Sequence, residues 1–254
     1  MLYSALAAAA PSGQVISNRF LAALPSADLA LLSPHLRDVP LERGAVLHEP
    51  GDELEHVYFP HSGMVSLVVV MLNGANVETA TLGRAGIVGA AAGLGSRCAQ
   101  GRAVVQLPGE AARLAADRFH AAVNESQAIR DLVVRYNDAL IMQIQQSVAC
   151  SALHTLDARL ARWLLQSHDC MDGQPIPLTQ DFLAQMLGVR RTTVTLTARL
   201  LQGAGVIHYS RGIVHIVDRA RLEQTACECY ATVRGHLDKV FGASSSHGHD
   251  HSAA

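Results

Sequence analysis

The chain has 254 residues, of which 49% are hydrophobic and 17% charged, and its formal net charge is −2. This length suits two modest domains with a core each, and the composition is that of a soluble globular protein. No stretch reaches the roughly 18 uncharged apolar residues that a membrane-spanning helix needs. A net charge near zero does not indicate that the protein binds nucleic acid. A nucleic-acid-binding site would have to be found from the distribution of charge along the chain.

The N-terminus, MLYSALAAAAPSG, has an Ala-rich run with no basic residue before it. A secretory signal needs that positive charge, so we expect residues 1–17 to form a flexible tail. The five cysteines show no paired framework; they are Cys98, Cys150, Cys170, Cys227 and Cys229. An odd number is awkward for a secreted disulfide-bonded protein, which favours a reducing cytoplasm.

An amphipathic stretch at 18–36 predicts a broken helix, because Pro25 and Pro34 limit its length. From Asp38 to Leu114, short apolar runs alternate with Gly- and Pro-containing turn signals, which is typical of antiparallel strands in a sandwich or roll. The clearest element is a hairpin of Met64–Leu72 and Asn76–Leu82, whose Asn-Gly pair can accept the positive φ angles of a tight turn.

A long helix is predicted from Ser126 to Ala149, where no Pro or Gly occurs. One stripe recurs along it at three- and four-residue spacing: Ile129, Leu132, Tyr136, Leu140, Gln143 and Ser147. The pattern fits burial against the helix's own domain and a dimer seam equally well. A polar Gln143 in the stripe favours a seam, because such a residue can set the register of pairing.

A second helix is expected from about Thr155 to His168, with Trp163 as a core anchor, before Gly and Pro residues break the chain at 172–177. Thr179 is then a plausible N-cap for a short helix from Gln180 to Leu187. Gly188 ends that helix, and a further helix runs from Arg190 to Gln202. Helix, glycine turn and helix form the DNA-reading unit of many regulators.

The charge is unevenly distributed, because Phe182 to Val217 contains no Asp or Glu. Basic residues at the start of a helix oppose its dipole, so an anionic partner explains Arg190 and Arg191 best. A hairpin wing with Arg211 at its tip follows. The candidate DNA-binding residues are Thr179, Arg190, Arg191, Thr192, Thr193, Thr195, Arg199 and Arg211.

Two segments, EPGDELEHVYFPHSGMVSL and LGVRRTTVTLTARLLQGAGVI, together with the order of roll, long helix and winged helix, resemble the Crp/Fnr family of bacterial regulators over residues 18–222. The resemblance implies an α+β fold, a homodimer joined through the long helix, double-stranded DNA and RNA polymerase as partners, and no enzymatic activity. The family's recognition helix has an Arg-Glu pair followed by another Arg. Arg191 matches the first position, whereas Thr192 and Leu196 occupy the others, so the archetype's target sequence does not carry over.

The resemblance also implies five segments: a tail at 1–17, an effector-sensing domain at 18–125, a dimerisation helix at 126–152, a winged helix-turn-helix at 153–222, and a C-terminal helix and tail at 223–254. The family's cyclic-nucleotide site has a Gly-Glu turn followed by an Arg-Ser or Arg-Thr pair. Here the corresponding residues are Gly89, Ala90, Ala91, Arg97 and Arg102. Because Ala90 replaces the acid, we expect an effector other than cyclic AMP.

Cysteine ligands for an iron–sulfur cluster are not grouped in the N-terminal region, so we expect no such cluster. Cys227 and Cys229 do not have the usual zinc spacing, and we predict reduced helix cysteines and no metal site. His247, His249 and His251 could bind a transition metal. One other class stays open, a metabolite or metal sensor in which DNA contact is secondary. A cupin-like metalloenzyme built on the roll is disfavoured, because His56 and His61 lack the close His-x-His pair of such metal sites.

Overall fold

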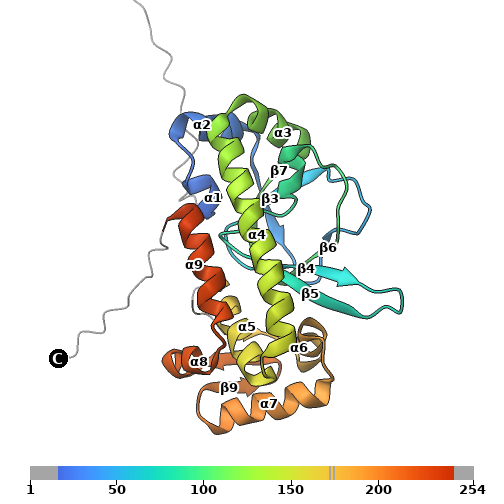
Figure 1. Ribbon diagram of the computed structural model, residues 1–254, viewed down its shortest axis with the longest axis vertical. Helices are drawn as coiled ribbons and strands as arrows, with labels where there is room; N and C mark the ends of the chain where they lie inside the picture. The colour runs from blue at the N-terminus through green and yellow to red at the C-terminus, as the bar shows by residue number, and fades with distance from the viewer. Residues whose placement is uncertain (1–16, 172, 174, 243–254) are drawn as a thin grey trace, which may run out of the picture.

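The computed structural model describes residues 17–171, 173 and 175–242 (Figure 1). An antiparallel β-roll comes first, a long helix lies against it, and a helical unit with a small sheet follows, so the predicted α+β class is confirmed. Nearly all of the expected N-terminal tail, and the histidines at 247–251, lie outside the described residues. Within the described part of the chain, no helix is long and apolar enough to cross a membrane.

The broken helix expected at 18–36 is confirmed as α1 (Arg19–Ala22), α2 (Ser26–Leu32) and the 3-10 helix η1 (Ser33–His35). Asn18 caps α1, since its Oδ1 accepts from the backbone N–H of Phe20. Its Nδ2 donates to the carbonyls of Pro60 and Gly86, both at 3.0 Å. The buried Asn18 amide therefore fixes the first helix to the roll.

The roll consists of two antiparallel sheets, with strand orders β1-β7-β3 and β2-β6-β4-β5. Its strands are β1 (Arg37–Leu41), β2 (Val46–His48), β3 (His56–Pro60), β4 (Met64–Val70), β5 (Asn76–Leu82), β6 (Arg102–Leu107) and β7 (Gly109–Ala115). The short 3-10 helix η2 (Ala90–Leu94) follows β5, and α3 (Ala116–Glu125) follows β7. Phe20, Phe59 and Phe119 pack their rings together in the core.

The predicted hairpin is present as β4 and β5, but its turn is looser than a two-residue turn. Residues 71–75 lie outside both strands, and the Met71 N–H bonds to the carbonyl of Ala75 at 2.7 Å. Only Gly74 takes a positive φ, of 81°, whereas Asn73 uses its Oδ1 to accept from the Ala75 N–H. The prediction of positive φ at both positions is therefore corrected, because the Asn73 side chain closes the turn instead.

The long helix is α4 (Gln127–Leu153), capped by the Ser126 hydroxyl, which accepts from the Ile129 N–H. It extends four residues beyond the predicted Ala149, because no glycine or proline interrupts it there.

The predicted dimer seam on α4 needs correction. Ile129, Leu132, Tyr136 and Gln143 are buried within the chain itself. The Tyr136 hydroxyl donates to the Ile87 carbonyl, and the Gln143 amide donates to the Thr81 carbonyl. Leu140 and Ser147 are partly buried in the same stripe. The predicted stripe thus packs on the chain's own roll, where its polar atoms find partners.

The C-terminal unit begins directly after α4. Its elements are α5 (Leu156–Cys170), β8 (Ile176–Pro177), α6 (Gln180–Leu187), α7 (Arg191–Gly203), β9 (Ile207–Ser210), β10 (Ile213–Ile216) and α8 (Arg219–Thr225). The three strands form one antiparallel sheet in the order β8-β10-β9. Trp163 is the predicted core anchor, being 1% exposed, and its Nε1 donates to the Glu78 carboxylate of β5 at 2.9 Å. This unit therefore packs on the hairpin of the roll.

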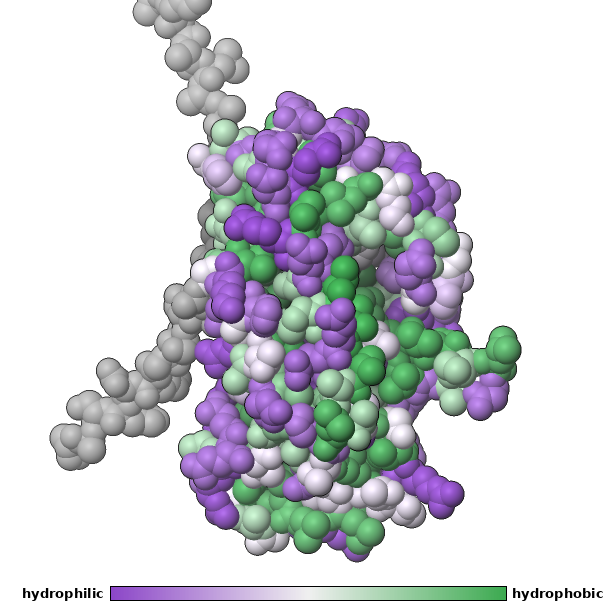
Figure 2. Space-filling model, in the orientation of Figure 1, coloured by the Kyte–Doolittle hydropathy of each residue, from purple (hydrophilic) through white to green (hydrophobic). Residues whose placement is uncertain are grey.

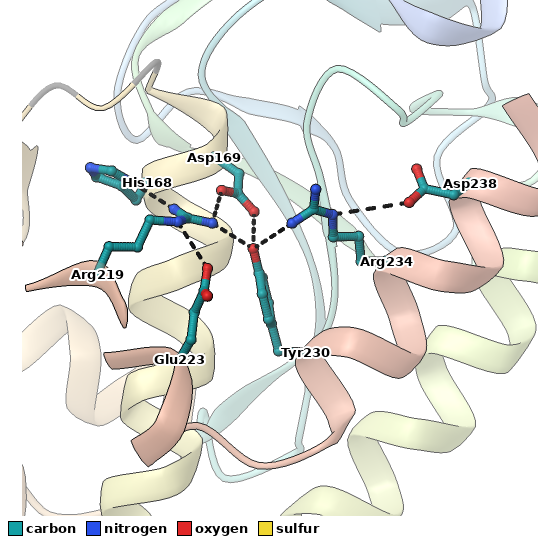
Figure 3. Close-up of polar contacts among 7 residues, drawn as sticks. All are labelled: His168, Asp169, Arg219, Glu223, Tyr230, Arg234 and Asp238. Atoms are coloured by element: carbon teal, nitrogen blue, oxygen red, sulfur yellow. Dashed lines mark hydrogen bonds and ion pairs between the residues drawn. The ribbon is translucent and has the colours of Figure 1, made fainter. Parts of the chain in front are cut away.

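The last helix, α9 (Cys229–Phe241), turns back and runs antiparallel to α4 towards α1 (Figure 1). A polar network fixes α9 to α5 and α8 (Figure 3). The Tyr230 hydroxyl donates to Asp169 at 2.7 Å and accepts from Arg219 at 2.8 Å, while Arg219 also pairs with Asp169 at 2.9 Å. The far end of α9 is held by the Arg19–Asp238 ion pair at 2.8 Å. Helix α9 therefore ties the C-terminal unit to α1.

Candidate nucleic-acid interface

Helix α6 begins and ends as its sequence predicts. The Thr179 hydroxyl accepts from the Phe182 N–H at 3.3 Å, and Gly188 ends the helix in the left-handed conformation, with φ 65°. That backbone conformation is costly for residues with a Cβ, so the glycine allows the sharp turn into α7. Because its hydroxyl caps α6, Thr179 acts here in positioning the two helices.

Helix α7 packs on α6 through Val194, Ala198 and Leu201, all buried as predicted. Arg190 is the residue before the helix, with an extended backbone, so the expected start at Arg190 is corrected to Arg191. The opposite face of α7 is exposed to solvent: Arg191, Thr192, Thr193, Leu196, Arg199 and Leu200. This face presents guanidinium, hydroxyl and methyl groups, which can contact phosphates and base edges.

Thr195 is placed differently from the other candidates. It is partly buried, and its hydroxyl lies 2.6 Å from Gln180 Oε1 and 3.0 Å from the Arg191 carbonyl. A hydroxyl has one proton to donate, and both of these neighbours are acceptors. The Thr195 side chain therefore fixes α7 to the start of α6, and its contact with DNA stays a prediction.

The wing is the β9–β10 hairpin, with Arg211 and Gly212 at its tip. Both have positive φ, of 50° and 77°, as a tight two-residue hairpin turn requires. The Tyr209 hydroxyl donates to the Leu178 carbonyl at 2.9 Å, and the Leu178 N–H donates to the Gly212 carbonyl at 2.7 Å. The wing is thus held against the segment that leads into α6, with Arg211 exposed at its tip.

One partner of Arg191 was missed by the sequence reasoning. Asp181, in the first turn of α6, lies with its Oδ2 3.2 Å from Arg191 Nη1. The two side chains are 63% and 67% exposed, so water screens the pair and its contribution to stability is small. Asp181 also places a negative charge beside the proposed DNA-reading face.

We expect Asp181→Asn to strengthen DNA binding by up to about fivefold, because an exposed ion pair of about 0.2 to 1 kcal/mol no longer competes with the DNA for Arg191. Fluorescence anisotropy with a labelled duplex at fixed salt measures the change. Asp157→Asn, at the first turn of α5, is the control for removing one negative charge elsewhere. If Asp181→Asn and Asp157→Asn bind the duplex with equal affinity, Asp181 does not compete with the DNA for Arg191.

The five candidate effector residues line neither of the two hollows described beside the roll. Gly89 has φ 79° and begins η2, and Ala90 is buried. Arg97 is ion-paired with Asp117, and Arg102 with Glu49 at 2.8 Å. Both guanidinium groups are therefore engaged by carboxylates of the chain rather than presented to a phosphate.

Two hollows near the roll are also unlike an anion site. The larger, about 410 Å³, lies at β2 and β3 and is lined by Asp52, Glu53 and Glu55 together with His48 and His56. The smaller lies between β5, α4 and α9, beside Tyr136 and Gln143, and holds about 30 Å³. The first has the wrong charge for a cyclic phosphate and the second has room for about one water molecule.

Family models match two parts of this chain. Residues 38–126 match the cyclic nucleotide-binding domain, and residues 158–225 match the Crp-like helix-turn-helix domain. The chain belongs to the Crp/Fnr family of transcription regulators. The predicted family and its DNA-binding character are thereby confirmed.

Solved Crp/Fnr structures have the same fold at low sequence identity. FixK2 from Bradyrhizobium japonicum is 13% identical with a TM-score of 0.65, covering 76% of this chain and 98% of its own. CLP from Xanthomonas campestris, a c-di-GMP responsive global regulator, is 16% identical at 0.60, covering 76% and 99%. A CRP/FNR family regulator from Thermus thermophilus is 20% identical at 0.61, covering 75% and 98%. No curated protein matched the regulator's sequence.

Proposed function

We propose that two copies of this regulator bind a palindromic promoter site, with α7 of each copy in a major groove of one half-site. The observation that carries this proposal is the exposed face of α7 beside the wing. Arg191 and Arg199 lie on that face, Arg211 lies at the wing tip, and no acidic residue occurs between Phe182 and Val217. Such a surface attracts phosphates and admits a helix N-terminus to the groove.

The residues of α7 divide into two roles in this proposal. Arg191, at the first helical position, can donate two parallel hydrogen bonds to guanine O6 and N7. Leu196, which is 61% exposed on the same face, can contact the methyl group of thymine. Arg190, Thr193, Arg199 and Arg211 contact phosphates and set the position of the helix. A Leu and a Thr at reading positions give this regulator its own target sequence.

The dimer seam is a second stripe of α4, distinct from the buried one. Val134, Ile141 and Val148 are 43%, 54% and 66% exposed and lie seven residues apart. Apolar residues at this interval form the seam of a coiled coil, and Ile144 adds to it three residues after Ile141. Pairing two copies through this stripe removes exposed apolar surface from water.

The space-filling view shows hydrophobic surface along the lower half of α4, continuing onto the β4–β5 hairpin (Figure 2). The exposed apolar residues there include Met71 and Leu72 at the hairpin tip. A contiguous apolar face that polar residues surround is typical of a protein interface. This face offers a partner copy a larger contact surface than the stripe on α4 alone.

The effector of this regulator, in our proposal, is not cyclic AMP. Ala90 has no carboxylate for a ribose, and Arg97 and Arg102 are held by Asp117 and Glu49. The cavity between β5, α4 and α9, about 30 Å³, is too small for a nucleotide. Calorimetry with cyclic mono- and dinucleotides tests this part of the proposal.

The Arg191→Ala variant tests the DNA-binding role directly. We expect the affinity for the selected palindrome to fall by about 1 to 3 kcal/mol, and the preference at the contacted base pair to relax. Arg118→Ala, at an exposed position of α3, is the matched control. The site is first selected from random duplexes, and titrations at several salt concentrations then give the number of phosphate contacts. An unchanged sequence preference for Arg191→Ala contradicts the base-reading role.

A further inference from the structure

Four metal-ligating side chains meet at the hinge between α4 and the C-terminal unit. Cys150 lies in the last turn of α4, and His154 is the residue at which α4 ends. Cys227 and Cys229 lie where α8 passes into α9. One ligand atom from each residue lies within 4.8 Å of all the others. The chain thus brings together two pairs of residues more than seventy positions apart.

The distances suit one tetrahedral ion. Cys150 Sγ is 3.6 Å from Cys227 Sγ, and Cys229 Sγ is 3.4 Å from His154 Nδ1. With zinc–sulfur bonds of about 2.3 Å, the sulfur atoms of a tetrahedral site lie about 3.8 Å apart. An iron–sulfur cluster distributes its thiolates over several iron atoms. Four ligand atoms this close together therefore favour a single ion.

The groups around the ligands are those that a metal centre uses. His154 turns Nδ1 towards the cysteines, while its Nε2 lies 3.2 Å from Glu228 Oε1. A carboxylate that accepts from the second nitrogen orients a histidine ligand and increases its basicity. Gln146 Nε2 donates to Cys229 Sγ at 3.0 Å. The arrangement is more polar than the packing of ordinary buried cysteines requires.

Positive charge compensates the thiolates that such a centre contains. Three thiolates and one neutral imidazole leave a net charge of −1 around a divalent ion. The guanidinium groups of Arg159 and Arg162, on α5, act electrostatically on the Cys150 sulfur. Arg159 also donates to the Leu187 carbonyl at the end of α6, at 2.6 Å. The site is therefore linked to the helix-turn-helix as well as to the hinge.

We propose that Cys150, His154, Cys227 and Cys229 bind one Zn²⁺ ion that fastens the start of α9 to the end of α4. Thiolate and imidazole ligands match the preference of zinc, and four protein ligands leave no open position, which is typical of a structural site. The three cysteines are buried, at 0%, 8% and 1% exposure for Cys150, Cys227 and Cys229. This proposal does not depend on the DNA-binding role of α7.

The first experiment measures zinc in the full-length protein, purified in reductant without chelator. His247, His249 and His251 are changed to alanine in every sample, because that segment could bind metal itself. We expect one zinc per chain by elemental analysis in this background and in Cys98→Ser, whose cysteine lies outside the cluster. We expect almost none in Cys150→Ser or Cys227→Ser.

The second experiment leaves all three cysteine ligands in place, so it does not depend on how well a protein without one of them folds. Cobalt replaces zinc in the wild-type cluster, and we expect the strong visible bands of tetrahedral Co²⁺ and a near-ultraviolet thiolate-to-cobalt transition. His154→Cys should retain the metal with an altered spectrum, whereas His154→Ala should lose it. Glu228→Gln should weaken zinc affinity by about 10- to 100-fold through the histidine.

Three outcomes would overturn the proposal. The first is a zinc content of Cys150→Ser equal to that of Cys98→Ser. The second is a cobalt spectrum without thiolate transitions. The third is a disulfide between Cys150 and Cys227 in the protein as purified. Thiol titration and mass spectrometry of the alkylated protein detect the disulfide. Loss of zinc without any change in the DNA affinity of the dimer leaves the proposed function intact, so the two proposals fail separately.

Discussion

Changing Ile141 to Asp is expected to convert the proposed dimer into monomers and to weaken binding to a full palindrome by about 10²- to 10⁴-fold. Ile141 is at the centre of the exposed stripe, with Val134 and Val148 seven residues away on either side. A carboxylate there would face its copy across an apolar seam, where desolvation of the charge is costly. Without pairing, the second half-site no longer binds intramolecularly, and the gain in effective concentration is lost.

Sedimentation equilibrium and anisotropy with full and half palindromes measure the two effects of Ile141→Asp. Val46→Asp is the matched control, since Val46 is 45% exposed on β2, at the sheet edge opposite β5. The half-site affinity of Ile141→Asp should equal that of the wild type, because α7 is unchanged. A variant that stays dimeric, or a wild type that is already monomeric, rules out this seam.

The largest effect on pH dependence is expected from Glu78→Gln. Burial raises the pKa of Glu78 from its ordinary 4.5 to about 7, although Ser66, Arg162 and Trp163 act in the opposite direction. Trp163 Nε1 donates to one carboxylate oxygen at 2.9 Å, and Ser66 Oγ donates to the other. This carboxyl lies where the roll meets α5, so its ionisation affects the contact between the two units.

The sign follows from which state binds the proton more tightly. Folded Glu78 holds its proton up to about pH 7, whereas the unfolded chain releases it near pH 4.5. Between these values the unfolded state binds fewer protons, so the free energy of unfolding falls as pH rises. At about 1.4 kcal/mol per pKa unit, the loss is at most about 3 kcal/mol. This loss of stability is complete above about pH 7 and absent below about pH 4.5.

Glutamine keeps an oxygen for Trp163 and an amide beside Ser66, so it mimics the protonated acid. We expect Glu78→Gln to flatten the decline and to be more stable than the wild type at pH 8. Urea unfolding from pH 4.5 to 8 at one protein concentration gives the comparison. Glu110→Gln, at an exposed position, should leave the decline unchanged. If the unfolding free energy of Glu78→Gln declines with pH as steeply as that of the wild type, a group other than Glu78 causes the decline.

Local signals predicted most of the fold. Thr179 and Gly188 mark the ends of α6 because a hydroxyl cap and a left-handed glycine act within a few residues. The strands and the helix-turn-helix follow from period-two and period-3.6 patterns in the same way. The contact between Thr195 and Gln180 was not predicted, because the two residues lie on different helices and no local pattern reports such a contact.

Helix α4 shows why periodicity alone does not identify an interface. Its residues are apolar on two faces, one packed on the roll around Tyr136 and one exposed around Ile141. Periodicity detects both faces, and only the packing of the folded chain distinguishes them. The cysteine cluster was missed for a related reason. Cys227 and Cys229 were considered as a pair, whereas Cys150 and His154 join them only when α9 folds back along α4.

Helix α9 also affects when the regulator becomes complete during synthesis. The Arg19–Asp238 contact joins positions 219 residues apart, so it forms only after α9 has been synthesised and has left the ribosome. Until then the first helix has no partner at that position, and Phe241 has not reached Phe20. A chain cut short by a premature stop before α9 is therefore left with an unfinished N-terminal unit, even where its helix-turn-helix has been made in full.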